Sequence, residues 1–590
     1  MRTSCLLLPL LALSLASPAV LASPQDELET GWSLLRTGDL RGAQAAFGVA
    51  ARTRKTREEA VAGALAVALA RADDVAMTAL LEGLEPTRAP ELVVLMAGAA
   101  ELALVQPMGN ALAWAEAACA FDEPQWPDDV AELCSWAPLL READGFTRAT
   151  GPDALVLPFS YAGAQPVVLV SVNGSEPVPL LVDTGASTSL LTEQAAQTLG
   201  LGRREDTALQ VAATGGLIPS WRDLVSFELG GTMIHDVPVI VADLPITGLA
   251  GILSPQTLWP DRVVELDFSK HELRVRAAED RTLAGVELPY REHGGRPYLE
   301  LSTTDRPMRP VVIDSGAAKT HLDQAWEQLG APLERGETFK TEGAGGVRAE
   351  VVATTGVLEA VAGDLSLSLP GPNLYTPHHA DAPGVRNYGL LGAEAWMGRV
   401  ITIDRAGRRL ALTDPPVLPP WEVGDQASFE VTKAGEQVGG FSERVVARDD
   451  VSVTLAITHT SDESFSFTLR TAEGWASRGA WMFTRPVLEA WVLDEDGDRA
   501  PLEDGGQSSW MTLFEPFRTV PSEEPPGLFF ASHEVAGETM SCTRLELPAV
   551  VGDVPAAFSM LECPASPWRV AEIQVQGADG VTAWGFRRVE

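Results

Sequence analysis

Apolar residues recur at helical spacing through the first part of the chain, residues 24–146. Leu35, Ala43 and Phe47 fall on one helical face, and the turn residues 37–39 interrupt the pattern. Apolar side chains at intervals of three and four are typical of amphipathic helices, and Gly and Asp are typical of the turns between them. The pattern therefore predicts an α-helical N-terminal domain over residues 24–146.

After residue 151 the pattern changes to short Val and Leu runs broken by Gly and Pro, which predicts β-strands. Near the C-terminus Val453, Leu455 and Ile457 alternate with polar residues, as in strands with one buried face. We predict an all-β region over residues 152–414 and a C-terminal antiparallel β domain, of the sandwich type, over 421–590. The proline-rich residues 415–420 between them predict a semi-rigid linker. The fold class is therefore multidomain.

The β-rich region contains one unit twice. Leu157-Pro158-Phe159 recurs as Leu288-Pro289-Tyr290, and Asp183-Thr184-Gly185 recurs as Asp314-Ser315-Gly316. Both pairs are separated by the same offset (288 − 157 = 131; 314 − 183 = 131). We therefore distinguish a first repeat, residues 152–280, from a second repeat, residues 283–414, and each has the usual size of a domain.

Each repeat places an aspartate, Asp183 or Asp314, directly after an apolar strand. Gly185 and Gly316 let the chain turn sharply behind it, so each carboxylate is expected at the end of a buried strand. The hydroxyl group of the intervening Thr or Ser can bond across to the other repeat, so that the two loops brace each other. Asp-x-Gly is also common in ordinary turns, but two copies inside matched flanks favour a shared function.

The two repeats resemble the subunits of retropepsin-like aspartic proteases, joined in one chain as the two lobes of pepsin are. Asp183-Thr184-Gly185-Ala186-Ser187 fits the D-T/S-G-A-S/T signature of that family, and Asp314-Ser315-Gly316-Ala317-Ala318 fits it except at Ala318. The family also carries a hydrophobic-hydrophobic-Gly element near the catalytic loop. Leu390-Leu391-Gly392 keeps this element, whereas Ile252-Leu253-Ser254 has Ser in place of Gly.

The resemblance implies a bilobal acid-protease core that acts as an aspartic endopeptidase, with Asp183 and Asp314 as the catalytic pair. Two carboxyl groups at hydrogen-bonding distance share one proton, so one can activate water while the other hydrogen-bonds the scissile carbonyl. No cofactor is implied. The substrate would be a polypeptide in extended conformation, and the protein would be a monomer with an internal pseudo-dimer. The supporting residues of the catalytic loops would be Thr184, Gly185, Ser187, Ser315 and Gly316.

Two Gly-rich stretches lie where such proteases carry hairpin flaps over the substrate. Glycine permits mobility and close approach of a substrate backbone, but a plain hairpin turn would have the same composition. The candidate flap residues are Thr214, Gly215, Gly216, Gly345 and Gly346.

Residues 31–50 resemble a tetratricopeptide helical hairpin, with Gly at the turn and Ala and Phe for close packing. A generic helix bundle explains the helical region equally well. Such a region could recruit a protein partner. The chain could then be an inert protease-fold scaffold that binds peptides, which is the alternative to the enzyme.

Composition and the N-terminus bear on location and partners. The formal net charge of −37 argues against binding to nucleic acid. Arg2, the apolar residues 6–15 and the small-residue site at 20–22 predict a signal peptide over residues 1–22, and hence export to the periplasm or the extracellular space. No later segment is apolar and long enough to predict a membrane span in the mature chain.

Four cysteines remain after removal of that segment, in two closely spaced pairs. Cys119/Cys134 and Cys542/Cys563 predict two local disulfides, consistent with an oxidising compartment. Neither pair has CxxC spacing, so no metal site is expected.

Overall fold

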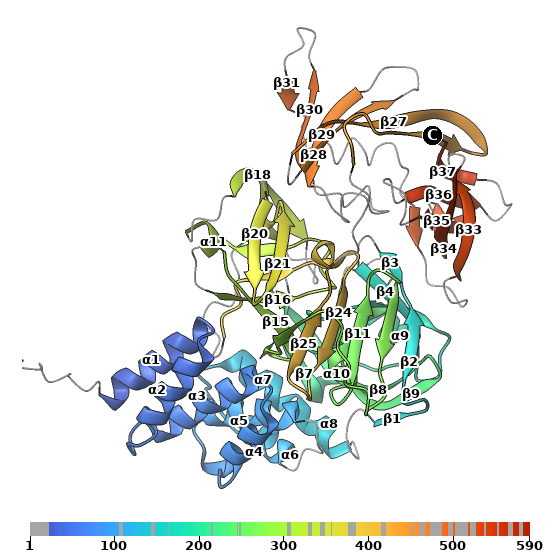
Figure 1. The fold of residues 1–590 in the computed structure, drawn as a ribbon. Coiled ribbons are helices and arrows are strands. Elements are labelled where there is room, and N and C mark those ends of the chain that lie inside the picture. Colours follow the sequence, from blue (N-terminus) through green and yellow to red (C-terminus); the bar gives the residue numbers. More distant parts are fainter. Residues whose placement is uncertain are drawn as a thin grey trace, which may run out of the picture.

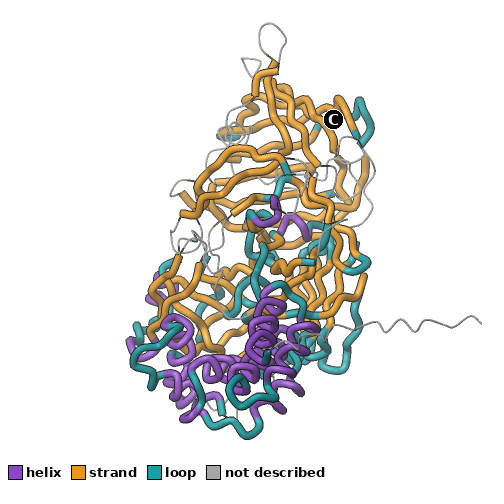
Figure 2. The backbone as a smooth tube through the Cα atoms, turned by 90° about the vertical axis from the view of Figure 1, so that its left-hand side faces the viewer, coloured by secondary structure: helices purple, strands orange, loops and turns teal. Residues whose placement is uncertain are grey.

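The computed structural model describes residues 23–589 except for internal stretches at 105–109, 143–147, 163–164, 214–215, 245, 247–248, 304–307, 329–332, 343–347, 356, 376–384, 415–420, 450–451, 460–465, 473–486, 494–498, 502–516, 520–526, 536–537, 552–553, 564–569 and 578–581. The predicted signal peptide, the linker 415–420, and Thr214, Gly215, Gly345 and Gly346 of the candidate flaps lie outside the described residues. Within the described ranges no helix is long and apolar enough to cross a membrane. Figure 2 shows most helices gathered at one end of the molecule, with strands forming the rest.

The N-terminal region is helical, as predicted. Ser23 begins the first helix: its hydroxyl group accepts the N–H of Asp26 at 3.1 Å, and the Asp26 carboxylate accepts the N–H of Ser23 at 2.9 Å. Asp39 caps the second helix by accepting the N–H of Gly42 at 2.8 Å. The elements are α1 (Pro24–Arg36), α2 (Leu40–Ala50), α3 (Arg57–Ala70), α4 (Asp74–Leu81), η1 (Pro86–Arg88), α5 (Glu91–Ala103), α6 (Ala111–Ala118), α7 (Pro127–Cys134) and α8 (Trp136–Glu142).

Phe47 is the centre of packing between α1, α2 and α3. It meets Trp32 edge-on with ring centroids 5.1 Å apart. A Cβ atom on Gly31 or Gly63 would lie 2.6 or 2.4 Å from the Phe47 ring, so both positions need glycine for the helices to approach this closely.

The two repeats lie between the helical region and the C-terminal sheet (Figure 1), and around their aspartates they share the order strand, strand, aspartate loop, strand, helix. The first comprises β2 (Leu155–Pro158), β3 (Ser160–Ala162), β4 (Gln165–Val172), β5 (Val178–Val182), β6 (Ser189–Thr192), α9 (Glu193–Thr198), η2 (Glu205–Thr207), β7 (Ala208–Ala213), β8 (Gly216–Leu229), β9 (Thr232–Ala242), β10 (Gly251–Leu253), α10 (Pro255–Leu258), β11 (Val263–Asp267) and β12 (Glu272–Val275), and β1 (Arg148–Thr150) precedes it.

The second repeat comprises β13 (Val286–Pro289), β14 (Glu292–His293), β15 (Arg296–Leu301), β16 (Arg309–Ile313), β17 (His321–Asp323), α11 (Ala325–Gln328), β18 (Glu334–Glu342), β19 (Arg348–Thr355), β20 (Val357–Ala362), β21 (Leu365–Pro370), β22 (Asn373–Tyr375), β23 (Gly389–Leu391), η3 (Ala393–Trp396), β24 (Val400–Asp404) and β25 (Arg409–Leu412). In the first repeat the central strands lie in the order β4-β5-β10-β6, and in the second the order is β15-β16-β23-β17. Corresponding strands thus occupy corresponding places.

A six-stranded sheet joins the repeats, in the order β13-β25-β24-β11-β12-β2. Its centre is the antiparallel pair β11 and β24, in which Leu266 lies opposite Ile401. Asp404 at the end of β24 is fully buried, and its carboxylate binds the guanidinium groups of Arg281 and Arg409 at 2.7 and 2.8 Å. This continuous sheet fixes one repeat relative to the other.

The helical region packs against the core through both apolar and charged contacts. Tyr298 and Val312 of the second repeat belong to the same apolar cluster as Phe47. Arg405 is buried, binds Glu292 at 2.9 Å, and also donates to the carbonyl of Ala103 in α5 at 2.7 Å. Removal of either partner of this pair would leave an uncompensated buried charge.

The C-terminal region is antiparallel, as predicted, but its described strands form one sheet and not the sandwich we expected. Two meanders meet where β26 pairs with β37, so that Phe429 lies opposite Arg588 and the sheet continues across the junction. The strands are β26 (Gln426–Lys433), β27 (Glu436–Arg448), β28 (Ser452–His459), β29 (Ser466–Ala472), β30 (Val487–Leu493), β31 (Arg499–Pro501), β32 (Phe517–Thr519), β33 (Gly527–Val535), β34 (Glu538–Val551), β35 (Val554–Glu562), β36 (Val570–Gly577) and β37 (Thr582–Arg588).

Both predicted cysteine pairs form disulfides. Cys119–Cys134 ties the end of α6 to the end of α7, and Cys542–Cys563 ties β34 to the residue after β35.

Candidate active site

The predicted aspartates stand at the ends of matching strands. Asp183 follows β5 and Asp314 follows β16. The backbone N–H of Asp183 donates to Leu253 of β10 at 2.9 Å, and that of Asp314 donates to Leu391 of β23 at 3.0 Å. Each aspartate is therefore anchored by a parallel strand pair, and both side chains are half-buried.

The two loops are interlocked by reciprocal hydrogen bonds. The hydroxyl group of Thr184 donates to the carbonyl of Ile313 at 2.7 Å, and that of Ser315 donates to Val182 at 2.8 Å. Each hydroxyl oxygen also accepts the other residue's backbone N–H, at 3.0 and 3.1 Å. Both side chains are completely buried, so neither loop can move without breaking bonds to the other.

The interlock brings the two carboxyl groups together, and each is close enough to the other to influence its pKa. A Cβ atom on Gly185 would lie 2.4 Å from Asp314 Cγ, and one on Gly316 would lie 2.2 Å from Asp183 Cγ. Glycine is thus required because each carboxyl group lies against the opposite loop. The N–H of Gly185 donates to Asp183 Oδ1 at 2.7 Å, and the N–H of Ala317 donates to Asp314 Oδ1 at 2.8 Å.

Burial and the facing carboxyl group hold the pKa of Asp183 well above its usual range. Burial also raises the pKa of Asp314, although the hydrogen bond from Asp183 and those from backbone N–H groups oppose this effect. Two like charges this close cannot both form readily, so the pair retains one proton under acidic conditions.

Ser254, which replaces the expected glycine, fits the loop of the first repeat. Its hydroxyl group donates to the carbonyl of Ala186 at 2.8 Å, and its N–H donates to Ser189 Oγ at 3.1 Å. In the second repeat a Cβ atom on Gly392 would lie 2.3 Å from the carbonyl carbon of Lys319, so no side chain fits there. A serine is therefore accommodated at this position in the first repeat, where it forms a hydrogen bond. In the second repeat a side chain is excluded because it would clash with the backbone.

Two buried side chains behind the loops were missed by sequence reasoning. Gln256 Nε2 donates to the carbonyls of Thr184, Ala186 and Gly295 at 3.0, 3.1 and 3.1 Å. At the matching position Glu394 accepts the N–H of Thr320 at 2.8 Å. Sequence spacing could have paired these two residues, because each lies three positions after a matched leucine, Leu253 or Leu391 (256 − 253 = 3; 394 − 391 = 3).

Burial raises the pKa of Glu394 to about 7, and the positive charge of Lys319 opposes that shift.

A second missed pair comes from the strands that precede the loops. Gln165 at the start of β4 donates to the carbonyl of Gly316, and Arg296 occupies the same position in β15 (296 − 165 = 131). Arg296 lies within electrostatic reach of both Asp314 and Asp183.

The remaining predicted residues lie around the pair. Ser187 is exposed at the edge of the first loop, and its carbonyl would lie 3.1 Å from a Cβ atom on Gly295. The carbonyl of Ala318, which replaces the expected hydroxyl residue, accepts the N–H of Glu394 at 3.4 Å. Gly216 is the first residue of β8, in the hairpin formed by β7 and β8.

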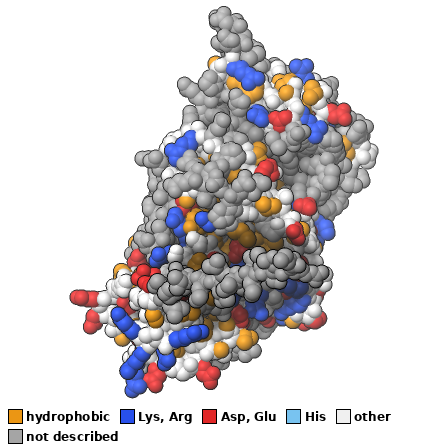
Figure 3. All heavy atoms as spheres, turned by 60° about the vertical axis from the view of Figure 1, so that its left-hand side comes forward, with side chains coloured by type: hydrophobic (Ala, Val, Ile, Leu, Met, Phe, Trp, Pro, Cys, Tyr) orange, Lys and Arg blue, Asp and Glu red, His pale blue; other side chains and the backbone are white. Residues whose placement is uncertain are grey.

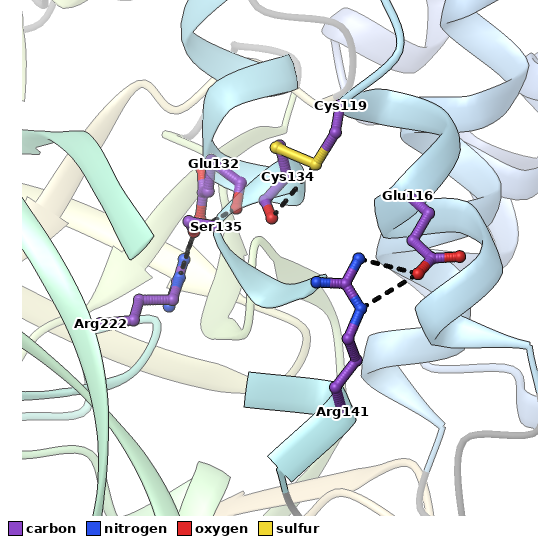
Figure 4. The surroundings of a disulfide bond; sticks show 7 residues. All are labelled: Glu116, Cys119, Glu132, Cys134, Ser135, Arg141 and Arg222. Atoms are coloured by element: carbon purple, nitrogen blue, oxygen red, sulfur yellow. Dashed lines mark hydrogen bonds and ion pairs between the residues drawn. A yellow bond between two sulfur atoms is a disulfide. The ribbon is translucent and has the colours of Figure 1, made fainter. Parts of the chain in front are cut away.

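The helical region holds that hairpin at its base (Figure 4). Arg222 of β8 is buried, and its Nε donates to Ser135 Oγ at 2.9 Å. Its Nη2 binds Glu132 of α7 at 3.2 Å, and the guanidinium lies 4.3 Å over the ring of Trp136. The Cys119–Cys134 disulfide lies beside these contacts, so the end of α7 that contacts the hairpin is itself cross-linked to the end of α6.

Among the described residues, no group of three or more His, Cys, Asp or Glu side chains could hold a metal ion. The titratable side chains that the two loops bring together are those of Asp183 and Asp314. On the face shown in Figure 3, acidic and basic side chains are interspersed over the described surface.

Residues 168–254 match the sequence model of a family described as aspartyl protease, and the match includes Asp183 and ends at Ser254. Conglutin gamma, a basic 7S globulin from lupine seeds, is a solved structure that resembles this chain with 13% sequence identity and a TM-score of 0.30. The similarity covers 45% of this chain and 95% of conglutin gamma. A search of curated proteins found no match.

Proposed function

We propose that the protein is an aspartic endopeptidase in which Asp183 and Asp314 activate a water molecule between them. The observation that carries the proposal is the pair of facing carboxyl groups, one from each repeat, which the reciprocal bonds of Thr184 and Ser315 hold against the opposite loops. The aspartyl protease family match over residues 168–254 supports the assignment for the first member of the pair.

The mechanism follows from the shared proton. With one carboxyl group ionised, the pair can take a proton from water while the protonated member hydrogen-bonds the carbonyl of the scissile peptide. Water then attacks without a covalent enzyme intermediate. Because the raised pKa values keep one proton on the pair under acidic conditions, activity should fall as rising pH removes that proton.

The two repeats would serve as the two lobes of a retropepsin-like tandem pair within one chain. The six-stranded sheet supports this arrangement because it joins the repeats through β11 and β24. The substrate would be an extended polypeptide, whose backbone pairs with strand edges while alternate side chains face each repeat. A monomer would then contain the complete site.

Export remains part of the proposal. Two disulfides form from the four cysteines downstream of the predicted signal peptide, and disulfides persist in oxidising compartments.

The test is cleavage of an unfolded protein substrate from acidic to neutral pH by wild type, Asp183→Asn and Asp314→Asn. Each single variant should lose about 10³-fold in kcat/KM, because general acid–base catalysis contributes roughly that much and neither carboxyl group can act alone. Asp122→Asn, at an exposed position in the helical region, is the matched control and should cleave like wild type.

Two results would contradict the proposal. Cleavage that survives in both single variants would place the chemistry elsewhere. Peptide binding without cleavage by wild type would favour the inert protease-fold scaffold, with the helical region as the site of partner recognition.

A further inference from the structure

A buried arginine, Arg222, joins the helical region to the first repeat. It lies on β8 and is only 1% exposed, and its guanidinium group contacts Ser135, Glu132 and the ring of Trp136. At the offset that relates the two Gly-rich stretches, the second repeat has Val352, which is buried in the apolar core (345 − 215 = 130; 352 − 222 = 130). A charged side chain is costly to bury. An arginine where the other repeat has valine therefore indicates that this position serves the contact with the helices.

The backbone of Arg222 is fixed as well as its side chain. Thr207, fully buried just before β7, donates its hydroxyl group to the carbonyl of Arg222 at 2.7 Å and accepts the N–H of Arg222 at 3.2 Å. Helix α7 also lies beside β7. On the helical side, the Cys119–Cys134 disulfide cross-links the end of α7 next to Ser135. Both sides of the contact are thus held firmly, so a shift of α7 should displace β8.

The face of β8 that carries Arg222 also reaches the aspartate loop of the first repeat. Ile218 is four residues from Arg222, so both side chains lie on the same face of the strand, roughly 13 Å apart. Ile218 is buried in one apolar cluster with Ala186 of the aspartate loop. Ile240, which lies opposite Arg222 in β9, belongs to the same cluster. One face of this sheet therefore contacts the helical region at Arg222 and the aspartate loop at Ala186.

Ala186 is in turn bonded to the aspartate. Its N–H donates to the carbonyl of Asp183 at 3.4 Å. Its own carbonyl accepts from Ser254 Oγ at 2.8 Å and from Gln256 Nε2 at 3.1 Å. Protein interiors are close-packed and transmit strain. A displacement of β8 should therefore reach the loop of Asp183 through the packing of Ile218 against Ala186.

We propose that the helical region positions the aspartate loop of the first repeat for catalysis, and that Arg222 is the positioning residue through which it acts. This inference rests on the proposed function, because it takes Asp183 as a member of the catalytic pair. A reacting group displaced by about 1 Å can cost about 10²-fold in rate. Because β8 stays paired with β7 and β9 when Arg222 is changed, we expect a smaller loss of about tenfold.

The experiment measures cleavage of an unfolded protein substrate by wild type, Arg222→Gln and Arg222→Lys from acidic to neutral pH. Arg222→Gln removes the ion pair with Glu132 and the charge over Trp136. Its kcat should fall about tenfold while KM changes by less than about twofold, because the aspartate loop acts in the transition state. Arg222→Lys keeps a charge beside Glu132 and should recover most of this loss.

The pH profile distinguishes positioning from a loss of folded protein. A looser loop lets the two carboxyl groups move apart, and the pair then gives up its shared proton more easily. The pH at which activity is half lost should therefore be lower in Arg222→Gln than in wild type. Partial unfolding would lower kcat without moving this pH.

Arg408→Gln is the matched control. Arg408, in the turn between β24 and β25, binds Asp73 of the helical region at 2.9 Å, so this variant also removes an ion pair between the helices and the core, but outside β8. It should keep the kcat and the pH profile of wild type. Thermal unfolding shows that each variant is folded. Ser135→Ala, which removes the acceptor of Arg222 Nε, serves if Arg222→Gln does not fold, and should shift kcat and the pH profile in the same direction.

The outcomes separate this inference from the proposed function. Unchanged cleavage by Arg222→Gln, a loss of kcat with the wild-type pH profile, or an equal loss in Arg408→Gln would each overturn the inference and leave the enzyme. If wild type cleaves nothing, the enzyme proposal fails, and hydrogen exchange of the backbone amides at 183–192 decides whether Arg222 holds the loop. Exchange about tenfold faster in Arg222→Gln but not in Arg408→Gln would support that role, and equal exchange would overturn it.

Discussion

The two repeats present the same aspartate loop to each other but support it from behind with different side chains. The surfaces that meet, including Thr184 and Ser315, are near copies, because each must bond the other. Behind them Ser254 and Gln256 stand in one repeat where Gly392 and Glu394 stand in the other. The difference shows that the reciprocal contact restricts which residues can occupy the surfaces that meet. Behind these surfaces, each repeat can be packed by its own set of side chains.

The two buried side chains behind the loops, Gln256 and Glu394, also bind different kinds of backbone atom. Gln256 donates hydrogen bonds to backbone carbonyl groups of the first loop. Glu394 is an acceptor for the N–H of Thr320, just beyond the second loop. Gln256→Glu should therefore destabilise the first loop, whereas Glu394→Gln should be tolerated by the second.

Gln256→Glu should give the largest effect. A carboxylate at this place would face the carbonyl oxygens of Thr184, Ala186 and Gly295 within about 3 Å, where the amide now donates. Loss of these bonds and burial of an unpaired charge should lower the free energy of unfolding by about 3–5 kcal/mol at neutral pH. Urea unfolding measures this change.

Gln256→Met is the control, since it keeps the shape and removes the donor without adding charge. It should cost less than Gln256→Glu, and its cost should not depend on pH. If Gln256→Glu were as stable as wild type, the first loop would not depend on this side chain.

Exchanging the glycine and serine sharpens the same comparison. In Gly392→Ser the new Cβ atom would lie 2.3 Å from the backbone of Lys319, so the second loop must shift. Overpacking of this kind should cost about 2–3 kcal/mol. In the reverse exchange, Ser254→Gly loses the hydrogen bond to Ala186 and adds backbone freedom to the unfolded chain, and should cost about 1–2 kcal/mol.

Unfolding midpoints in urea for the two variants give the difference directly. Equal losses would mean that the two loops tolerate side chains alike, contrary to the contacts at Lys319. Cleavage should fall more in Gly392→Ser than in Ser254→Gly, because the shift in the first of these reaches the loop that carries Asp314.

Much of this arrangement could be predicted from local patterns and the internal repeat. The helices of residues 24–146, both disulfides and the proximity expected of Asp183 and Asp314 follow from spacing and duplication. Local alternation gives strands but not their partners, so the pairing of β26 with β37 that makes one C-terminal sheet was missed.

The contact of Arg222 with Ser135 was missed for a similar reason. It joins residues 87 positions apart in the sequence, and no local pattern records which surface of the helical region meets the core. Gln256 and Glu394 were missed because their roles depend on burial and on the backbone atoms that they face, which composition does not reveal.

The last variant, Glu394→Gln, tests the second support through its pH dependence. The folded-state pKa of Glu394 is about 7 against an ordinary value of 4.5, so between these values the folded protein binds more protons than the unfolded one. Stability from this group is complete below pH 4.5 and is lost as pH rises through 7.

A glutamine oxygen can still accept the N–H of Thr320 and never ionises. The variant should therefore match wild type near pH 4 and exceed its free energy of unfolding by roughly 3 kcal/mol near pH 8. Urea unfolding at both pH values measures this, with Glu205→Gln, whose side chain is 80% exposed, as the control that should show no such trend. A variant no more stable than wild type at pH 8 would mean that Glu394 is ionised at little cost, and the contrast with Gln256 would then lie in geometry alone.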